Sequence, residues 1–376
     1  MKLDLSPDQE LVRDTTRRFL SERTPLTEVR RLADDPAGYD RAYWTQGAEL
    51  GWTAMLVPEE HGGGSLTGEG LLDLVLVAEE MGRLVSPGPL VPVNVVASAL
   101  GAVGSAAQCD GVLPGLIAGE TVAAWCLAEP GGAWGSAEEL TVTAERTSAG
   151  WVLAGIKGPV EAAADADHLL VVARTVDGPT QFLVPATTPG VTVVALRSLD
   201  LVRRFAEVRF AGAEVPADAV VGEVGGAAGD VERQLNVAVA LQSAETVGVL
   251  DRTFAFTLEY AFDRYSFGRP LASYQALKHR FADLKMWLEA CHATATGAAE
   301  AVQAGTADAG RLASVAAAYI GERSTAMVQD CVQLHGGIGI TWEHDIHLYL
   351  RRATVNRAMY GTPKQHRQRL GALLAA

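Results

Sequence analysis

The order of apolar and polar residues divides the chain into three stretches with different periodicities. The first helix is expected to begin at Ser6, where Pro7 suits the first helical position and Gln9 completes a capping box. A loop at residues 58–64 breaks the helical pattern, which resumes after it. We therefore expect an N-terminal α-helical domain over residues 1–120. The apolar positions at helical spacing in its first helix include Leu11, Val12, Phe19 and Leu20.

The pattern changes near residue 121 to short segments rich in Val, Leu and Trp. Turn residues at 148–150 and 177–179 separate some of these segments. The pattern is typical of strands, and we expect a middle, β-barrel-like domain over residues 121–222. The expected strands are 121–128, 140–145, 151–157, 168–174, 181–185, 190–196 and 206–210.

Helical periodicity returns after about residue 222. A long helix is expected over residues 232–264, because Leu241, Val247 and Leu250 recur along one face of it. We expect a C-terminal four-helix bundle domain over residues 223–376, and hence an α+β fold of three domains. Its other expected helices are 274–304, 307–334 and 341–359.

Composition restricts the kinds of partner. The chain has 376 residues, 48% of them hydrophobic, and a formal net charge of −14. This charge excludes nucleic acid as an expected partner, because phosphate backbones are bound by basic surfaces. Single arginines and helix N-termini can still bind a small anion.

Neither a metal site nor a membrane segment is expected. The four cysteines are far apart in the sequence and form no CxxC pair, so we expect buried, reduced thiols. His344 and His347 have metal-ligand spacing but no third ligand nearby, which favours a hydrogen-bonded helix start. The charged N-terminus has no signal-peptide pattern, and the apolar run 90–100 is too short to span a bilayer. We expect a cytoplasmic protein with no membrane partner.

Two motifs carry candidate anion-binding chemistry. In Arg264-Tyr265-Ser266-Phe267-Gly268-Arg269-Pro270, the first arginine can bind a pyrophosphate bidentately, and the glycine permits close backbone approach. In Gln333-Leu334-His335-Gly336-Gly337-Ile338-Gly339, adjacent glycines expose N–H groups, and a helix expected from Thr341 adds its positive end. Taken singly, the first could also be a helix end closed by glycine and proline, and the second a linker.

With the segment 274–284, these motifs resemble the flavin-dependent acyl-CoA dehydrogenase family. The resemblance runs from Ser6 to Leu370 and includes the helical–β–helical order. It implies an acyl-CoA substrate and an FAD cofactor whose pyrophosphate and adenosine end lies at a subunit boundary. The residues that it implies for FAD binding are Arg264, Phe267, Gln275, Gln333, Gly336 and Gly337.

The catalytic base of that family is missing from both of its usual positions. The family motif Tyr-Glu-Gly-Thr is replaced here by Met359-Tyr360-Gly361-Thr362, and a phenol with a pKa of about 10 is a poor base at neutral pH. Some members carry their Glu on the long helix instead, where this chain has Ala238. Glu245 lies two helical turns from that position, about 10 Å away. We expect Glu245 to pair with Arg252, and retain it as an alternative base.

Two further departures concern the redox ring. The family uses a threonine that bonds the flavin ring, where this chain has Ala128. The family usually also has a Trp-Ile-Thr-like stretch that lies against the flavin ring. In this chain the corresponding residues are Gly158-Pro159-Val160-Glu161-Ala162. Ring contacts are therefore lost while the pyrophosphate contacts to a neighbouring subunit remain. The segments that the resemblance places along the acyl channel are Met55, Leu56, the loop 62–64 and residues 84–87.

This pattern is similar to subunits of actinobacterial heteromeric (α2β2) acyl-CoA dehydrogenases of sterol side-chain degradation. The leading interpretation is a subunit without the base, whose partner supplies the Glu; an electron-acceptor protein is a further expected partner. Two alternatives stay open. One is a homotetrameric dehydrogenase that uses Glu245, and the other is a binding or structural paralogue without redox activity.

Overall fold

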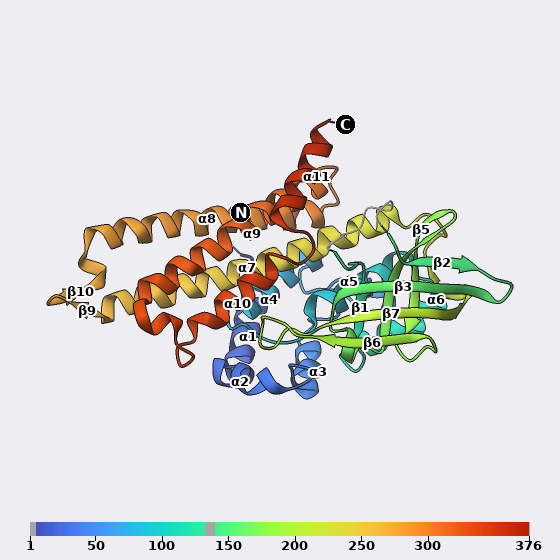
Figure 1. Ribbon diagram of the computed structural model, residues 1–376, viewed down its shortest axis with the longest axis horizontal. Coiled ribbons are helices and arrows are strands. Elements are labelled where there is room, and N and C mark those ends of the chain that lie inside the picture. The colour runs from blue at the N-terminus through green and yellow to red at the C-terminus, as the bar shows by residue number, and fades with distance from the viewer. Residues whose placement is uncertain (1–4, 132–139, 376) are drawn as a thin grey trace.

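The β-sheet comes from the middle of the chain and lies at one end of the molecule, and the long C-terminal helices extend from it towards the other end (Figure 1). The computed structural model describes residues 5–131 and 140–375. The capping box predicted for the first helix is confirmed, because Ser6 Oγ accepts from the Gln9 N–H and the Gln9 side chain accepts from the Ser6 N–H, both at 3.2 Å. The N-terminal helices are α1 (Pro7–Arg23), α2 (Leu26–Arg31), α3 (Arg41–Glu49), α4 (Gly70–Arg83), α5 (Leu90–Val103) and α6 (Ala106–Ile117).

The central sheet is mixed and has eight strands among the described residues, in the order β6-β7-β3-β2-β4-β5-β8, with β1 parallel to β4. All the predicted strands form. The turn predicted at 177–179 is displaced, because β5 already begins at Gly178, and β8 was not predicted. The strands are β1 (Ala123–Cys126), β2 (Thr143–Arg146), β3 (Gly150–Glu161), β4 (His168–Thr175), β5 (Gly178–Pro185), β6 (Val191–Leu196), β7 (Phe205–Pro216) and β8 (Val220–Val221).

Long helices form the C-terminal part. The 36-residue helix α7 (Ala228–Asp263) packs against α8 (Gln275–Gln303) and α9 (Ala309–His335), and a short hairpin joins α7 to α8. This hairpin of β9 (Tyr265–Ser266) and β10 (Arg269–Pro270) forms the tip opposite the sheet in Figure 1. The remaining helices are α10 (Ile346–Asn356) and α11 (Pro363–Ala375).

The helix predicted from residue 341 begins five residues later. Residues Gly336–Ile340 form a 3₁₀ turn, and α10 begins only at Ile346. The His344 Nδ1 accepts a bond from the Ile346 N–H at 3.3 Å, which favours a helix start at that point. The hydrogen-bonded helix start predicted for His344 is thus present. Within residues 5–131 and 140–375, no three His, Cys, Asp or Glu side chains are grouped to hold a metal ion.

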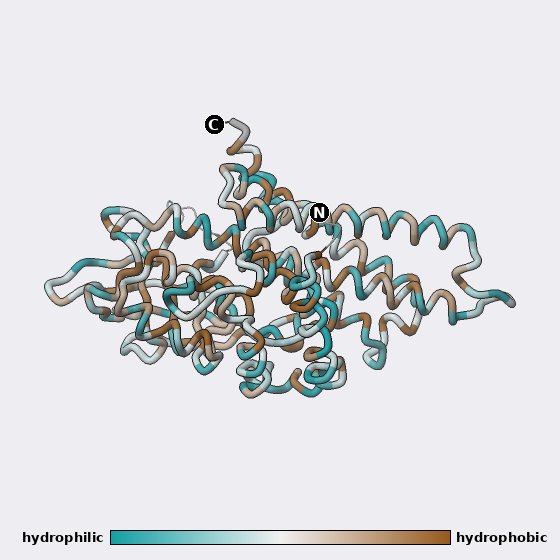
Figure 2. Tube along the Cα trace, turned by 180° about the vertical axis from the view of Figure 1, so that it is seen from behind, coloured by the Kyte–Doolittle hydropathy of each residue, from teal (hydrophilic) through white to brown (hydrophobic). Residues whose placement is uncertain are grey.

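Two glycines let α4 and α7 cross in close contact. A Cβ atom added at Gly82 would lie 1.9 Å from the carbonyl oxygen of Glu245, and one at Gly248 would lie 1.9 Å from that of Glu79. The crossing belongs to a hydrophobic interior that is concentrated in the middle of the molecule (Figure 2). No helix in the described part of the chain is both long and apolar enough to cross a bilayer.

Candidate functional site

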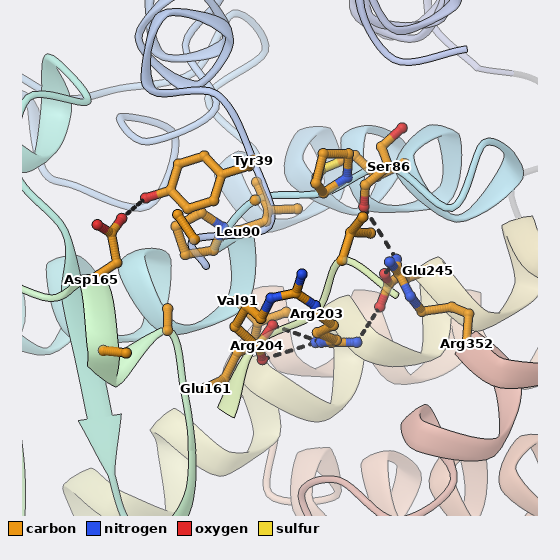
Figure 3. A pocket seen from close by; sticks show the side chains of 18 of the residues that line it. Tyr39, Ser86, Leu90, Val91, Glu161, Asp165, Arg203, Arg204, Glu245 and Arg352 are labelled. Carbon is orange, nitrogen blue, oxygen red and sulfur yellow. Dashed lines mark hydrogen bonds and ion pairs between the residues drawn. The ribbon is translucent and has the colours of Figure 1, made fainter. Parts of the chain in front are cut away.

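A network of buried ion pairs lies where β3, α7, α10 and the loop before β7 meet (Figure 3). Arg203 binds Glu161 through two bonds of 2.6 and 3.0 Å. It also reaches Glu245 at 2.8 Å. Arg352 binds the other oxygen of Glu245 at 2.6 Å and forms an ion pair with Asp200. The two arginines and three carboxylates therefore hold one another in place.

The network keeps Glu245 ionised. Burial would raise the pKa of Glu245, but the charges of Arg203 and Arg352 outweigh burial and hold this pKa below its ordinary value. Both carboxylate oxygens are occupied by guanidinium groups. The predicted pairing with Arg252 is wrong, since Arg252 lies 3.5 Å from Glu259 instead. Glu245 thus has little capacity to accept a proton from a substrate.

Tyr360, which is predicted to replace the family base, is a buried phenol. Its side chain is 4% exposed, its ring stacks on Trp125 at 6.2 Å between centroids, and its hydroxyl donates to Glu161 at 3.2 Å. Burial and the negative charge of Glu161 raise the pKa of the phenol. Its φ of 52° is uncommon for a residue other than glycine. Tyr360 therefore serves as a fixed hydrogen-bond donor.

The other predicted departures are also buried. Ala238 presents only a methyl group from α7 and has no exposed surface. The Gly158 N–H donates to the Ala128 carbonyl oxygen at 2.8 Å, which brings the two segments predicted to have lost ring contacts side by side. Lys157 and Glu129 form a buried ion pair at 2.7 Å close to them. This pair fixes the backbone of both segments.

A cavity of about 190 Å³ adjoins the network. Charged groups of the network form part of its wall, and the Tyr39 hydroxyl, bonded to Asp165, closes another part. Of the segments expected along an acyl channel, Ser86 and Pro87 line this cavity. Met55 and Leu56 are absent from its described lining. The remaining wall is largely apolar and includes Ala37, Met81, Leu90, Val91 and Val202.

The predicted pyrophosphate residues lie at the far end of the bundle, away from the sheet. Arg264 ends α7 with its side chain exposed, and among the described residues its guanidinium has no hydrogen-bond or ion-pair partner. Phe267, at the tip of the hairpin, is 98% exposed. The ring of Tyr260 stacks on His335 at 4.4 Å, which joins the end of α7 to the end of α9. The structure thus brings both predicted anion-binding motifs to one end.

The glycine motif offers open backbone at this end. No atom lies within 4 Å of a Cβ atom built at Gly336 or Gly337. Gln333 is exposed beside them, and Gln275 is exposed at the start of α8. The positive helix end predicted at Thr341 is absent, because α10 begins only at Ile346. The available groups among the described residues of these motifs are therefore amides and two guanidiniums without a hydrogen bond or ion pair, those of Arg264 and of Arg269, which stacks on the Tyr274 ring.

Sequence reasoning missed most of the ion-pair network. It did not single out Arg203, Arg352 or Asp200, and it treated Glu161 only as part of a replaced segment. The available signal was charge inside apolar surroundings, since Arg203 follows Leu201 and Val202 directly. Its partners are distant in sequence, so the signal could not identify them.

Comparisons with known proteins place these features in one family. Residues 6–120 match the N-terminal domain of acyl-CoA dehydrogenases, and residues 228–374 match their C-terminal domain. The acyl-CoA dehydrogenase IpdE2 of Mycolicibacterium smegmatis is 30% identical over 369 residues, which cover 98% of this chain and 99% of the relative.

Two solved structures of paired chains share the fold. A chain of the ChsE4-ChsE5 complex from Mycobacterium tuberculosis superposes with a TM-score of 0.89 at 28% identity, covering 100% of this chain and 99% of the other. A chain from a variant of the Tcur3481-Tcur3483 steroid ACAD gives 0.88 at 29%, covering 98% and 97%. The protein therefore belongs to the acyl-CoA dehydrogenase family.

Proposed function

We propose that this chain is the subunit without a catalytic base in a heteromeric, FAD-dependent acyl-CoA dehydrogenase. The complex would introduce a double bond between the α and β carbons of an acyl-CoA thioester. The observation that carries this proposal is the hydrogen bond between Tyr360 and Glu161 at 3.2 Å.

In this chain, that bond occupies the space in which the acyl chain would lie between the base and the flavin. Dehydrogenation needs a base on one side of the substrate and an acceptor of hydride on the other. Tyr360 replaces the base, and Glu161 belongs to the segment that replaces the ring-facing stretch. Their side chains touch, so no carbon chain fits between them. The base and the substrate cleft must then come from the partner.

The ring-binding half of the site does not fit a flavin. Ala128 offers no hydroxyl to the ring, and the carboxylates and guanidiniums of the network already satisfy one another. A ring placed there would lack its usual hydrogen-bond partners, which lowers affinity.

The pyrophosphate-binding half does fit. FAD, when bound, accepts the hydride from the β carbon. Arg264 would hold its diphosphate with an unpaired guanidinium, and the amides of Gly336 and Gly337 would donate to the same anion. Phe267 and Gln333 would contact the adenosine end, and Gln275 lies at the same end of the bundle. These groups suit a cofactor held mainly by a neighbouring subunit.

The surface at this end also supports a partner subunit. Large apolar side chains are exposed there, including Phe262, Tyr265, Phe267 and Ile340. Burying them against another chain is favourable, since each apolar Å² removed from water contributes roughly 25 cal/mol. The paired-chain relatives and the steroid ACAD support an α2β2 assembly that acts on a steroid side-chain CoA. An electron-acceptor protein would then reoxidise the flavin.

The homotetrameric alternative requires Glu245 to act as the base. Its two arginine partners and its lowered pKa argue against that role. The alternative of a binding paralogue without redox activity does not explain why the Arg264 guanidinium is unpaired among the described residues or why the backbone at Gly336 and Gly337 is open.

Purification tests the proposal directly. The chain is produced alone and together with a neighbour-encoded chain of the same family that carries a Glu in either base position. We expect a colourless protein alone, and a yellow complex that acyl-CoA reduces. A yellow, acyl-CoA-reducible protein from this chain alone would falsify the proposal. A complex that forms without flavin or activity would favour the binding paralogue.

A further inference from the structure

A second cavity lies behind the α4–α7 pair, on the side away from the ion-pair network. Its volume is about 270 Å³, and α1, α4, α7 and α8 enclose it. Ala244 and Val247 of α7 face this cavity, whereas Glu245 faces the network. Most of the wall is apolar and includes Leu72, Val75, Leu76, Ala295 and Ala299. The size approaches that of small-ligand sites.

Most charged groups on its rim are already paired. Arg17 binds Glu80 through two bonds of 2.6 and 3.0 Å, and Arg83 forms an ion pair with Asp251. Among the described residues of the rim, no unpaired arginine therefore points to an anionic ligand. The carboxylates of Glu79 and Glu300 are the exceptions, since neither has a hydrogen bond or an ion pair among the described residues.

Glu79 faces the cavity from α4, next to Glu80. It is partly buried on α4, and among the described residues it has neither a hydrogen bond nor an ion pair. His292 on α8 lines the same cavity and is likewise without a hydrogen bond there. A partly buried carboxylate without a partner is less well solvated than one on the surface, and a bound cation offsets that loss.

We propose that this cavity binds a small organic ammonium compound. Its ammonium group would donate to the Glu79 carboxylate, and its apolar body would lie along Val75, Val247 and Ala299. His292 would accept a second hydrogen bond. Charge-assisted bonds of this kind are stronger than neutral ones. The site is independent of the acyl-CoA and FAD assignments.

The titration of Glu79 makes the site sensitive to pH. Burial, and then the charge of Glu80, raise the pKa of Glu79 to about 7, against the opposing charges of the arginines. Burial lowers the pKa of His292, which keeps its imidazole neutral and able to accept a hydrogen bond from the ligand. An ammonium ion binds the ionised carboxylate, so affinity must rise with pH through about 7. The titratable groups that face Glu79 are Arg13 and Arg17 of α1, Glu80 and Arg83 of α4, Asp251 of α7, and His292 and Glu300 of α8.

Cyclohexylamine and cyclohexanol are suitable probes, because they share a ring and differ in charge. Calorimetry and ligand-observed NMR would measure the binding of each to the purified chain, or to the complex that it forms. We expect the amine to bind about tenfold more tightly one pH unit above 7 than one unit below it. Cyclohexanol should bind weakly at both pH values.

Variants separate the carboxylate from the cavity. Glu79→Gln should abolish the pH dependence and weaken amine binding about tenfold or more. Glu322→Gln, which alters an exposed carboxylate on α9, should change neither. Ala295→Phe should block both probes by filling the cavity, and thermal unfolding checks that each variant is folded. Equal binding of amine and alcohol, an unaffected Glu79→Gln variant, or no amine binding would each overturn the proposal.

Discussion

The Tyr360 hydroxyl and the Glu161 carboxylate form a 3.2 Å hydrogen bond that ties the loop after α10 to the end of β3. Tyr360→Phe removes this bond and keeps the stacking on Trp125. We expect the free energy of unfolding to fall by about 1–3 kcal/mol, because the bond has a charged acceptor. Urea unfolding measures this change. In the heteromeric complex, kcat should stay the same, and a tenfold loss would mean that Tyr360 takes part in the reaction.

Restoring the family residue should not restore activity. Tyr360→Glu places a second carboxylate beside Glu161, while Arg203 is already shared with Glu245. We expect a destabilised chain, because like charges in a buried site repel. Purified alone, the variant should not reduce flavin on addition of acyl-CoA. Turnover by this single variant would show that the chain has a usable cleft of its own.

Glu245 should matter for stability and not for turnover. Glu245→Gln leaves Arg203 and Arg352 without a shared counter-charge, and we expect a loss of about 2–4 kcal/mol in the free energy of unfolding at neutral pH. The turnover of the complex should be nearly unchanged, provided that it is measured at a temperature where the variant is folded. A large fall in kcat with an intact fold would support the homotetrameric alternative.

The acid stability of the chain should also depend on Glu245. The folded pKa of Glu245 lies below its ordinary value, so its stabilising contribution is present at neutral pH and is lost as pH falls through the folded pKa. The folded pKa of Asp200 is also below its ordinary value, so its stabilising contribution is lost in the same way as the pH falls. Chemical unfolding at a series of acidic pH values should give a shallower pH dependence for Glu245→Gln than for the parent chain. Parallel curves would contradict this assignment.

Flavin retention should depend on Arg264. Arg264→Ala removes the unpaired guanidinium from the bundle end, and we expect FAD binding by the complex to weaken about tenfold or more. Absorbance of the bound flavin after dialysis measures this loss. Arg252→Ala, on the same helix and paired with Glu259, is the matched control and should retain FAD. Equal flavin content in both variants would remove Arg264 from the cofactor site.

The α4–α7 crossing should not tolerate a methyl group. Gly248→Ala places a Cβ atom 1.9 Å from the Glu79 carbonyl oxygen, and backbone atoms cannot move aside without separating the helices. We expect a loss of at least about 2 kcal/mol. Gly297→Ala on α8 is the control, because no atom lies within 4 Å of its added Cβ atom. It should stabilise the chain by about 0.5–1 kcal/mol, since alanine favours a helix.

Local patterns predicted the elements well, because they depend on neighbouring residues. Short segments rich in Val, Leu and Trp, with turns between them, located the strands, and the Ser6 capping box located α1. The start of α10 was misplaced because a bond from Ile346 to His344 competes with a longer helix. Glu245 was assigned to Arg252 from spacing along one helix. Its true partners, Arg203 and Arg352, are 42 and 107 residues away in sequence, and only the fold brings them to it.

The ion-pair network also limits which amino-acid substitutions this chain can accept during evolution. Arg203, Arg352, Glu161, Glu245 and Asp200 are buried together. Replacing an arginine leaves Glu161 or Asp200 without its ion pair, and replacing a carboxylate leaves an arginine with one counter-charge fewer. Under the proposed function, an independent dehydrogenase site would need Tyr360 replaced, the network dismantled and the predicted ring contacts rebuilt. The first of these steps would lower stability before any activity appeared. If the chain is the subunit without a base that we propose, the interlocked charges would therefore oppose the recovery of an independent active site.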